Sequence, residues 1–250
     1  MDIRRNIEGR ETLYVETDED IRVFGKIDGG AYVIFDSQGS IVIEGKVDQG
    51  SNVSLRAVGD IQIGVVGEAG DRKIDGGSQV TAKSSGGSII LGDKVDGHSQ
   101  FTAECPAGAI SIGGKVDAGS AVRLVAGNDI AIGLFGAPGD RKVDGGSRVS
   151  CLSRGGRVQI HGKVDGASVV DLAAEGLVEV ITTGSEDDRK ISGGSRLTCT
   201  SRRESVHIHG RVDLDSFVTL TAAEDVRIAG TEDPKNHRVC LLYTSPSPRD

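Results

Sequence analysis

The heptapeptide Gly-Lys-Val-Asp-Gln-Gly-Ser at residues 45–51 returns in near copies along almost the whole chain. Aligned on the lysine, the copies mark turn starts at Asn6, Lys26, Lys46, Lys73, Lys94, Lys115, Lys142, Lys163, Lys190, Arg211 and Arg238. The steps are 20 or 21 residues in some turns and 27 in others, and from Lys115 onward 27 and 21 alternate. Internal repeats of this length, in sequence of β type, predict a solenoid whose turns bury their apolar faces against each other.

Apolar residues keep fixed offsets from the lysine in each turn. The next residue is β-branched, as in Ile27, and residues seven and nine positions after the lysine are mostly apolar. Eleven positions after it only small residues occur, such as Ala126, which indicates an inner corner. Pairs such as Ile61 and Ile63 alternate with polar residues, the period of two that a strand has.

These columns predict about three short strands in each turn, with glycines supplying the corners. No stretch has a helical period. Because parallel crossover connections are overwhelmingly right-handed, we expect a single-stranded right-handed parallel β-helix, an all-β fold of about ten turns of 20–27 residues.

Residues 1–239 are predicted to form one repeat domain. Asn6 already opens a turn and Arg238 begins another, so we expect a fragment truncated at both ends. Residues 240–250, CLLYTSPSPRD, break every column and resemble the translation of a transposase-type sequencing-library adapter. We therefore expect this tail to be non-native.

Composition excludes two classes of partner. The formal net charge is −8, and the chain has eight aromatic residues, no Trp and no basic cluster interleaved with aromatics, so we expect no nucleic-acid binding. No apolar run approaches the roughly 20 residues that cross a bilayer, so we expect no membrane insertion. The first eleven residues are too charged for a secretory signal.

Three cysteines outside the tail fall in inward columns. Cys151 and Cys199 share a column two turns apart, about 9.6 Å by the layer spacing and beyond the roughly 7 Å limit for a disulfide. We interpret them, together with Cys105, as buried free thiols.

The most regular polar feature is an aspartate column two residues after the lysines. Its members are Asp28, Asp48, Asp75, Asp96, Asp117, Asp144, Asp165 and Asp213, with Glu8 and Ser192 as departures. Stacked carboxylates can chelate Ca²⁺ or act as an acid and base pair. They can also accept backbone N–H groups in the turn that follows, which is the role we favour, so no cofactor is expected and Ca²⁺ is the alternative.

The second feature is a set of nine-residue loops at 64–72, 133–141, 181–189 and 229–237. Insertions on one face of a repeat protein often form its binding surface. They can also be extra loop residues without a function, which a surface loop tolerates at small cost. The candidate binding residues are Glu68, Asp71, Arg72, Asp140, Arg141, Glu186, Asp187, Asp188, Arg189, Glu232 and Asp233.

Histidines give a third signal. His207 and His209 share one outward strand face and can hold a metal, but no third ligand is evident and His161 lies two turns from His209. A solvated polar face is the interpretation we favour. No P-loop, nucleophile elbow or zinc cysteine cluster is present, and every polar residue that could be recruited is repeated, which argues against a single active site and an enzyme.

The turn pattern resembles the shafts of bacterial surface adhesins of the filamentous-haemagglutinin type. The resemblance includes the sequences that lead into the short strands, such as Gly-Asp-Ile at residues 59–61 and Asn-Asp-Ile at residues 128–130. This resemblance implies export to the cell surface or secretion, and a passive shaft whose loops bind other proteins or surface polysaccharide.

Two alternatives remain open. The chain is also similar to bactofilins, which implies a cytoplasmic scaffold that self-associates end to end. A β-helical polysaccharide lyase or hydrolase would need aromatic platforms for sugars, whereas Phe35 and Phe101 fall in core columns.

Overall fold

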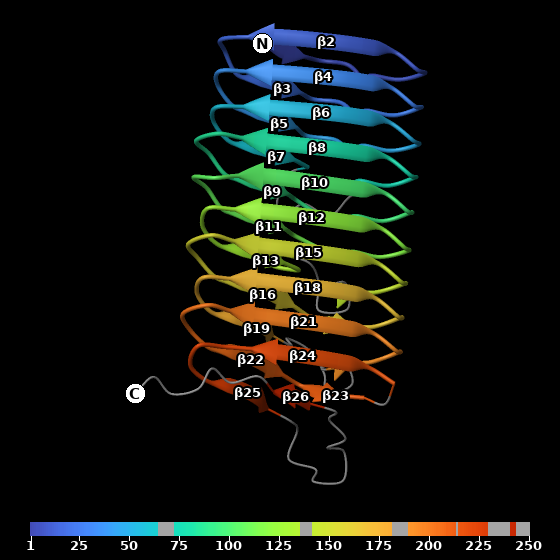
Figure 1. Ribbon diagram of the computed structural model, residues 1–250. Coiled ribbons are helices and arrows are strands. Elements are labelled where there is room, and N and C mark those ends of the chain that lie inside the picture. The colour runs from blue at the N-terminus through green and yellow to red at the C-terminus, as the bar shows by residue number, and fades with distance from the viewer. Residues whose placement is uncertain (65–72, 136–141, 182–189, 214, 230–240, 244–250) are drawn as a thin grey trace.

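The computed structural model describes residues 1–64, 73–135, 142–181, 190–213, 215–229 and 241–243 (Figure 1). The chain is a right-handed parallel β-helix, as predicted. Strands from successive turns pair in parallel, and two sheets of eleven strands each run the length of the ladder. The described residues contain no helix with the length and apolar character that crossing a membrane requires.

The sheet that faces the viewer in Figure 1 has the longer strands, and we call it the long-strand sheet. Its members are β2 (Thr12–Thr17), β4 (Tyr32–Ser37), β6 (Asn52–Ala57), β8 (Gln79–Ser84), β10 (Gln100–Cys105), β12 (Ala121–Ala126), β15 (Arg148–Ser153), β18 (Val169–Ala174), β21 (Arg196–Ser201), β24 (Phe217–Thr221) and β26 (Leu241–Tyr243). The tail thus contributes β26, which pairs with β24.

The second sheet, called here the short-strand sheet, lies behind the first. Its members are β1 (Asp2–Ile3), β3 (Ile21–Val23), β5 (Ile41–Ile43), β7 (Ile61–Ile63), β9 (Ile89–Leu91), β11 (Ile110–Ile112), β13 (Ile130–Ile132), β16 (Val158–His161), β19 (Val178–Ile181), β22 (Val206–His209) and β25 (Val226–Ala229).

A third ladder follows the repeated lysine. It consists of β14 (Lys142–Val143), β17 (Lys163–Val164), β20 (Lys190–Ile191) and β23 (Arg211–Val212). Isolated parallel bridges extend it through the earlier turns, from Ile7↔Ile27 to Val116↔Val143. The expectation of about three short strands in each turn is therefore confirmed.

The core is the stack of inward columns. Residues next to the lysines, such as Ile27 and Val116, are fully buried, and so are Phe35 and Phe101. Each inward side chain meets the equivalent residue of the turn before and after, because the register pairs column with column, as Val122 with Val149. Burial of a Val or Ile contributes roughly 1.5–3 kcal/mol, so neighbouring turns stabilise each other.

The strand bounds explain the three turn lengths. In 20-residue turns the small inner-corner residue lies four positions before the short strand, as Ser37 before Ile41. In 21-residue turns it lies five positions before, as Ser84 before Ile89, so the extra residue sits at the inner corner. In 27-residue turns the inner corner keeps four positions, and seven residues are added after the short strand.

Serine side chains stabilise the longer inner corner. Ser84 Oγ donates to the carbonyl of Gly59 in the previous turn at 2.7 Å and accepts the N–H of Gly87 at 2.8 Å. Ser153 and Ser201 repeat this donation to the previous turn. These buried hydroxyls satisfy backbone groups that would otherwise lack partners.

The Asp-x-x-Ser segment of each repeat is a tight turn. In residues 75–78 the N–H of Ser78 donates to the carbonyl of Asp75, and both central glycines have positive φ, 61° at Gly76 and 75° at Gly77. Positive φ at both central residues is the pattern of a type I′ turn, which glycine adopts without strain.

Candidate functional site

The aspartate column has the turn role that we favoured. Asp117 Oδ1 accepts the backbone N–H of Ala118 at 2.6 Å, and its Oδ2 lies 2.6 Å from Nζ of Lys115. The same two partners, the next backbone N–H and the lysine two residues earlier, engage Asp48, Asp75, Asp96, Asp144 and Asp165. Both oxygens of each carboxylate are thus engaged, and a Ca²⁺ ion would have to displace these bonds.

Aspartates of this column are attracted to the lysine of their own turn and to the lysine of the next turn. Partial burial alone would raise the pKa of Asp117, but the hydrogen bonds from Lys115 and Ala118, and the charge of Lys142 in the next turn, lower it below its ordinary value. Where the column lacks aspartate, at Ser192, the serine hydroxyl donates to Asp165 Oδ1 at 2.9 Å. The exception therefore joins its turn to the previous one by a hydrogen bond.

The cysteines are buried and free, as predicted. Burial raises the pKa of the Cys105 thiol to about 11, and burial raises the pKa of Cys151 and of Cys199 further. Thiols with raised pKa are poor nucleophiles and metal ligands, so these residues serve as small core side chains.

The predicted binding residues of the nine-residue loops lie outside the described residues. These are Glu68, Asp71, Arg72, Asp140, Arg141, Glu186, Asp187, Asp188, Arg189, Glu232 and Asp233. The points at which the loops leave the helix are described. All four loops follow strands of the short-strand sheet, namely β7, β13, β19 and β25. They therefore start from one corner of the β-helix.

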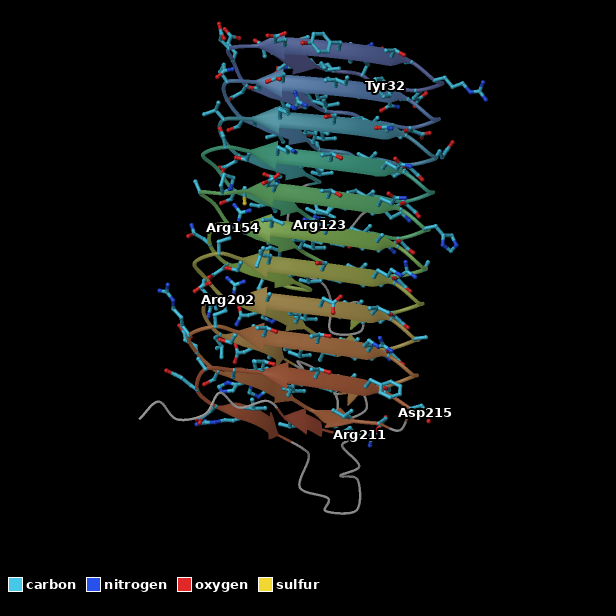
Figure 2. All side chains as sticks on the ribbon, viewed as in Figure 1. Tyr32, Arg123, Arg154, Arg202, Arg211 and Asp215 are labelled. Atoms are coloured by element: carbon cyan, nitrogen blue, oxygen red, sulfur yellow. The ribbon has the colours of Figure 1, made fainter. Side chains whose placement is uncertain are left out.

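Shallow depressions mark the outer surface. One crosses the long-strand sheet and includes Arg123, Arg148 and Asp171 from three adjacent turns. Another lies at an inner corner between Arg154, Glu175 and Arg203. Figure 2 shows Arg123 on the front of the ladder and Arg154 and Arg202 along its left edge. Arg202 and Arg203 both pair with Glu175 at 3.0 Å, so the carboxylate offsets only one of the two positive charges.

The most distinctive cluster consists of the two neighbouring histidines predicted from the sequence and a glutamate from the previous turn. Glu179 on β19 lies in register with His207 on β22, and His209 is two residues further along β22 on the same outward face. Oε1 of Glu179 is 3.7 Å from Nδ1 of His207 and 3.5 Å from Nε2 of His209. The expectation that the histidines lack a third ligand is thus wrong, because Glu179 from the previous turn joins them.

The cluster is only partly accessible to solvent. The exposed fraction of the side chain is 15% for Glu179, 22% for His207 and 46% for His209. The two imidazole rings meet edge to face with centroids 6.1 Å apart, and Nε2 of His207 is buried without a hydrogen-bond partner in the described structure. Gln159, from the turn before Glu179, donates to its Oε2 at 2.8 Å. His161 lies on β16, the strand before β19, and is not part of the cluster.

Comparison with known proteins adds no family to this geometry. No protein-family model matches the chain, and the searches of curated proteins and of solved structures return no match either. Function must therefore be argued from the residues themselves.

Proposed function

We propose that the chain is an elongated, non-catalytic shaft that presents a row of loops for binding. The observation that carries this proposal is the shared origin of the loops, since all four leave one sheet at equivalent positions of different turns. A rigid ladder with insertions at one corner is the arrangement by which repeat proteins display binding surfaces.

The spacing of the row favours an extended ligand. In the short-strand sheet, β7, β13, β19 and β25 are separated by three, two and two layers. At about 4.8 Å per layer, the loops start roughly 14, 10 and 10 Å apart. Weak contacts at several such points add strength only when one ligand reaches them together, as a protein chain or a surface polysaccharide does.

The resemblance to filamentous-haemagglutinin-type shafts supports display at a cell surface. In that setting the β-helix supplies length and stiffness, and the loops supply recognition. The regular Lys–Asp columns fit this division of roles, because they stabilise the turns without forming a single reactive centre.

Loop deletion tests the proposal. A variant that lacks residues 65–71, 134–140, 183–189 and 231–237 would be compared with the full chain on an array of immobilised surface polysaccharides and extracellular proteins. We expect the full chain to bind members of one class, and the deletion variant to bind them at least tenfold more weakly with an unchanged β-type circular dichroism spectrum.

Two results would contradict the proposal. Binding that survives all four deletions would assign recognition to the sheets. Growth of filaments with increasing protein concentration, seen by electron microscopy in the full chain and in the deletion variant alike, would favour the self-associating scaffold.

A further inference from the structure

We propose that Glu179, His207 and His209 form a binding site for Zn²⁺ or a chemically similar divalent transition-metal ion. The proposal does not depend on the shaft function. Among the described residues, these three form the one group of His, Cys, Asp or Glu side chains whose ligand atoms all lie within 4.8 Å of one another.

The distances from the Glu179 carboxylate to the two histidine rings suit ligands of one metal ion better than direct hydrogen bonds. At 3.5 and 3.7 Å, the separations between Glu179 Oε1 and the two ring nitrogens are too long for hydrogen bonds. Zinc ligands lie about 2.1 Å from the ion, so the edge of a tetrahedral site is about 3.4 Å. The observed separations are close to that edge, and one ion can contact all three atoms with small rotations of the side chains.

Glu179 is held in the orientation that a metal ligand needs. Gln159 donates to Oε2 and leaves Oε1 directed toward the histidines. Such outer hydrogen bonds commonly fix the orientation of a ligating carboxylate. Within the described structure Glu179 ion-pairs with neither Lys nor Arg, so no fixed cation occupies the place of the metal.

The charges around the cluster do not repel a cation strongly. Arg227, in register with His207 on the next strand, pairs with Asp225 at 2.8 Å, and Arg211 pairs with Asp213 at 3.2 Å. Two imidazoles and one carboxylate suit zinc, whereas Ca²⁺ and Mg²⁺ prefer oxygen ligands only. The exposure of His209 gives the ion a way in and leaves a fourth position for water or a group from a bound partner.

The cluster occurs at one place in a repetitive molecule, so it can be compared with the equivalent positions of an earlier turn. Two turns earlier, His161 stands where His209 stands, but Gln159 replaces His207 and Ala131 of the preceding strand replaces Glu179. That earlier position has one imidazole and no carboxylate. The objection that each candidate polar residue is repeated therefore does not apply to these three.

Metal titration of the full chain tests the proposal. Isothermal titration with Zn²⁺ in a non-chelating buffer should show one site per chain, and Co²⁺ should give the visible absorption of a tetrahedral complex. Glu179→Gln, His207→Ala and His209→Ala should each weaken binding at least tenfold, because each removes one ligand. Gln159→Ala should weaken it by about tenfold, the lower end for loss of an outer hydrogen bond.

Matched variants separate this site from general metal binding by histidine. His98→Ala and His161→Ala should leave the affinity unchanged, and circular dichroism should show that all variants keep the β-helix. Equal concentrations of Ca²⁺ or Mg²⁺ should not displace Zn²⁺. The proposal would be overturned by no stoichiometric binding to the full chain, or by binding that the Glu179→Gln and His207→Ala variants retain.

Discussion

Gly76 and Gly77 are neighbours with the same backbone conformation and different surroundings. Both have positive φ, but a Cβ on Gly76 would lie 2.5 Å from Oδ1 of Asp48 in the previous turn, whereas a Cβ on Gly77 would meet nothing within 4 Å. We predict that Gly77→Ala lowers the free energy of unfolding by about 1 kcal/mol through backbone strain. Gly76→Ala should cost about 1–3 kcal/mol more, because the Cβ overpacks the turn.

Urea unfolding followed by circular dichroism measures both variants. The matched control is a double-mutant cycle with Asp48→Ala, in which Gly76→Ala should cost less in the Asp48→Ala background than in the full chain, because the carboxylate is absent. Equal losses for the two glycine variants would show that strain alone decides this position. Ala118 stands at the position of Gly76 in its own turn and Ala167 at that of Gly77, both with positive φ, so the chain tolerates the strain. The extra loss expected at Gly76 therefore depends on the contact with Asp48.

At the scale of the ladder, the Lys–Asp columns should make stability depend on pH. Burial alone would raise the pKa of Asp75 and Asp165, but hydrogen bonds from lysine and backbone N–H groups, with Ser192 also donating to Asp165, lower it below the ordinary 3.8. A lowered pKa contributes stability that is present above pH 3.8 and lost as the pH falls through the folded-state value. We predict that the free energy of unfolding falls steeply below about pH 4.

The lysines set the alkaline side. The hydrogen bond to Asp144 raises the pKa of Lys142 above its ordinary 10.5, so this contribution is present below pH 10.5 and lost as the pH rises through the folded-state value. Urea unfolding of Asp117→Asn at several pH values tests the column, since the amide can still accept the N–H of Ala118. Its deficit should be clear at pH 7, shrink as the pH falls below 3.8 and vanish below the lowered folded-state pKa of Asp117. A deficit that does not change with pH would mean that the ion pair contributes nothing.

The inward strand positions could be predicted from the sequence, whereas the cluster of Glu179, His207 and His209 could not. Columns counted from the lysine locate every inward residue up to the inner corner, because the first eleven positions have equal length in all turns. Beyond that corner, turns of 21 residues contain one extra residue. Glu179 is therefore 16 positions after its lysine and His207 is 17 positions after its own. Because strand faces alternate, an odd difference in position predicts opposite faces. The extra residue at the inner corner of the later turn removes this difference, and the two residues pair in register.

Over the whole molecule, insertions are confined to two corners while the three ladders stay in register. The seven extra residues of each long turn follow the short strand, and the strands on either side still pair as in turns without them, as β5 with β7 and β7 with β9. A 20-residue turn such as that from Lys26 to Lys46 shows that the same columns close without the insertion. The loops are thus separable from the fold.

This separability gives a quantitative prediction for the variant that lacks residues 65–71. The deletion joins Gly64 to Arg72 and leaves two residues between Ile63 and Lys73, as Gly92 and Asp93 do between Leu91 and Lys94. Closing a shorter loop costs less chain entropy, by about 0.6 kcal/mol for each halving of its length. We therefore expect thermal unfolding, followed by circular dichroism, to show a melting temperature equal to or slightly above that of the full chain. A large loss of stability would mean that residues 65–71 hold the turns together, and loss of binding on their deletion would then no longer identify them as a recognition surface.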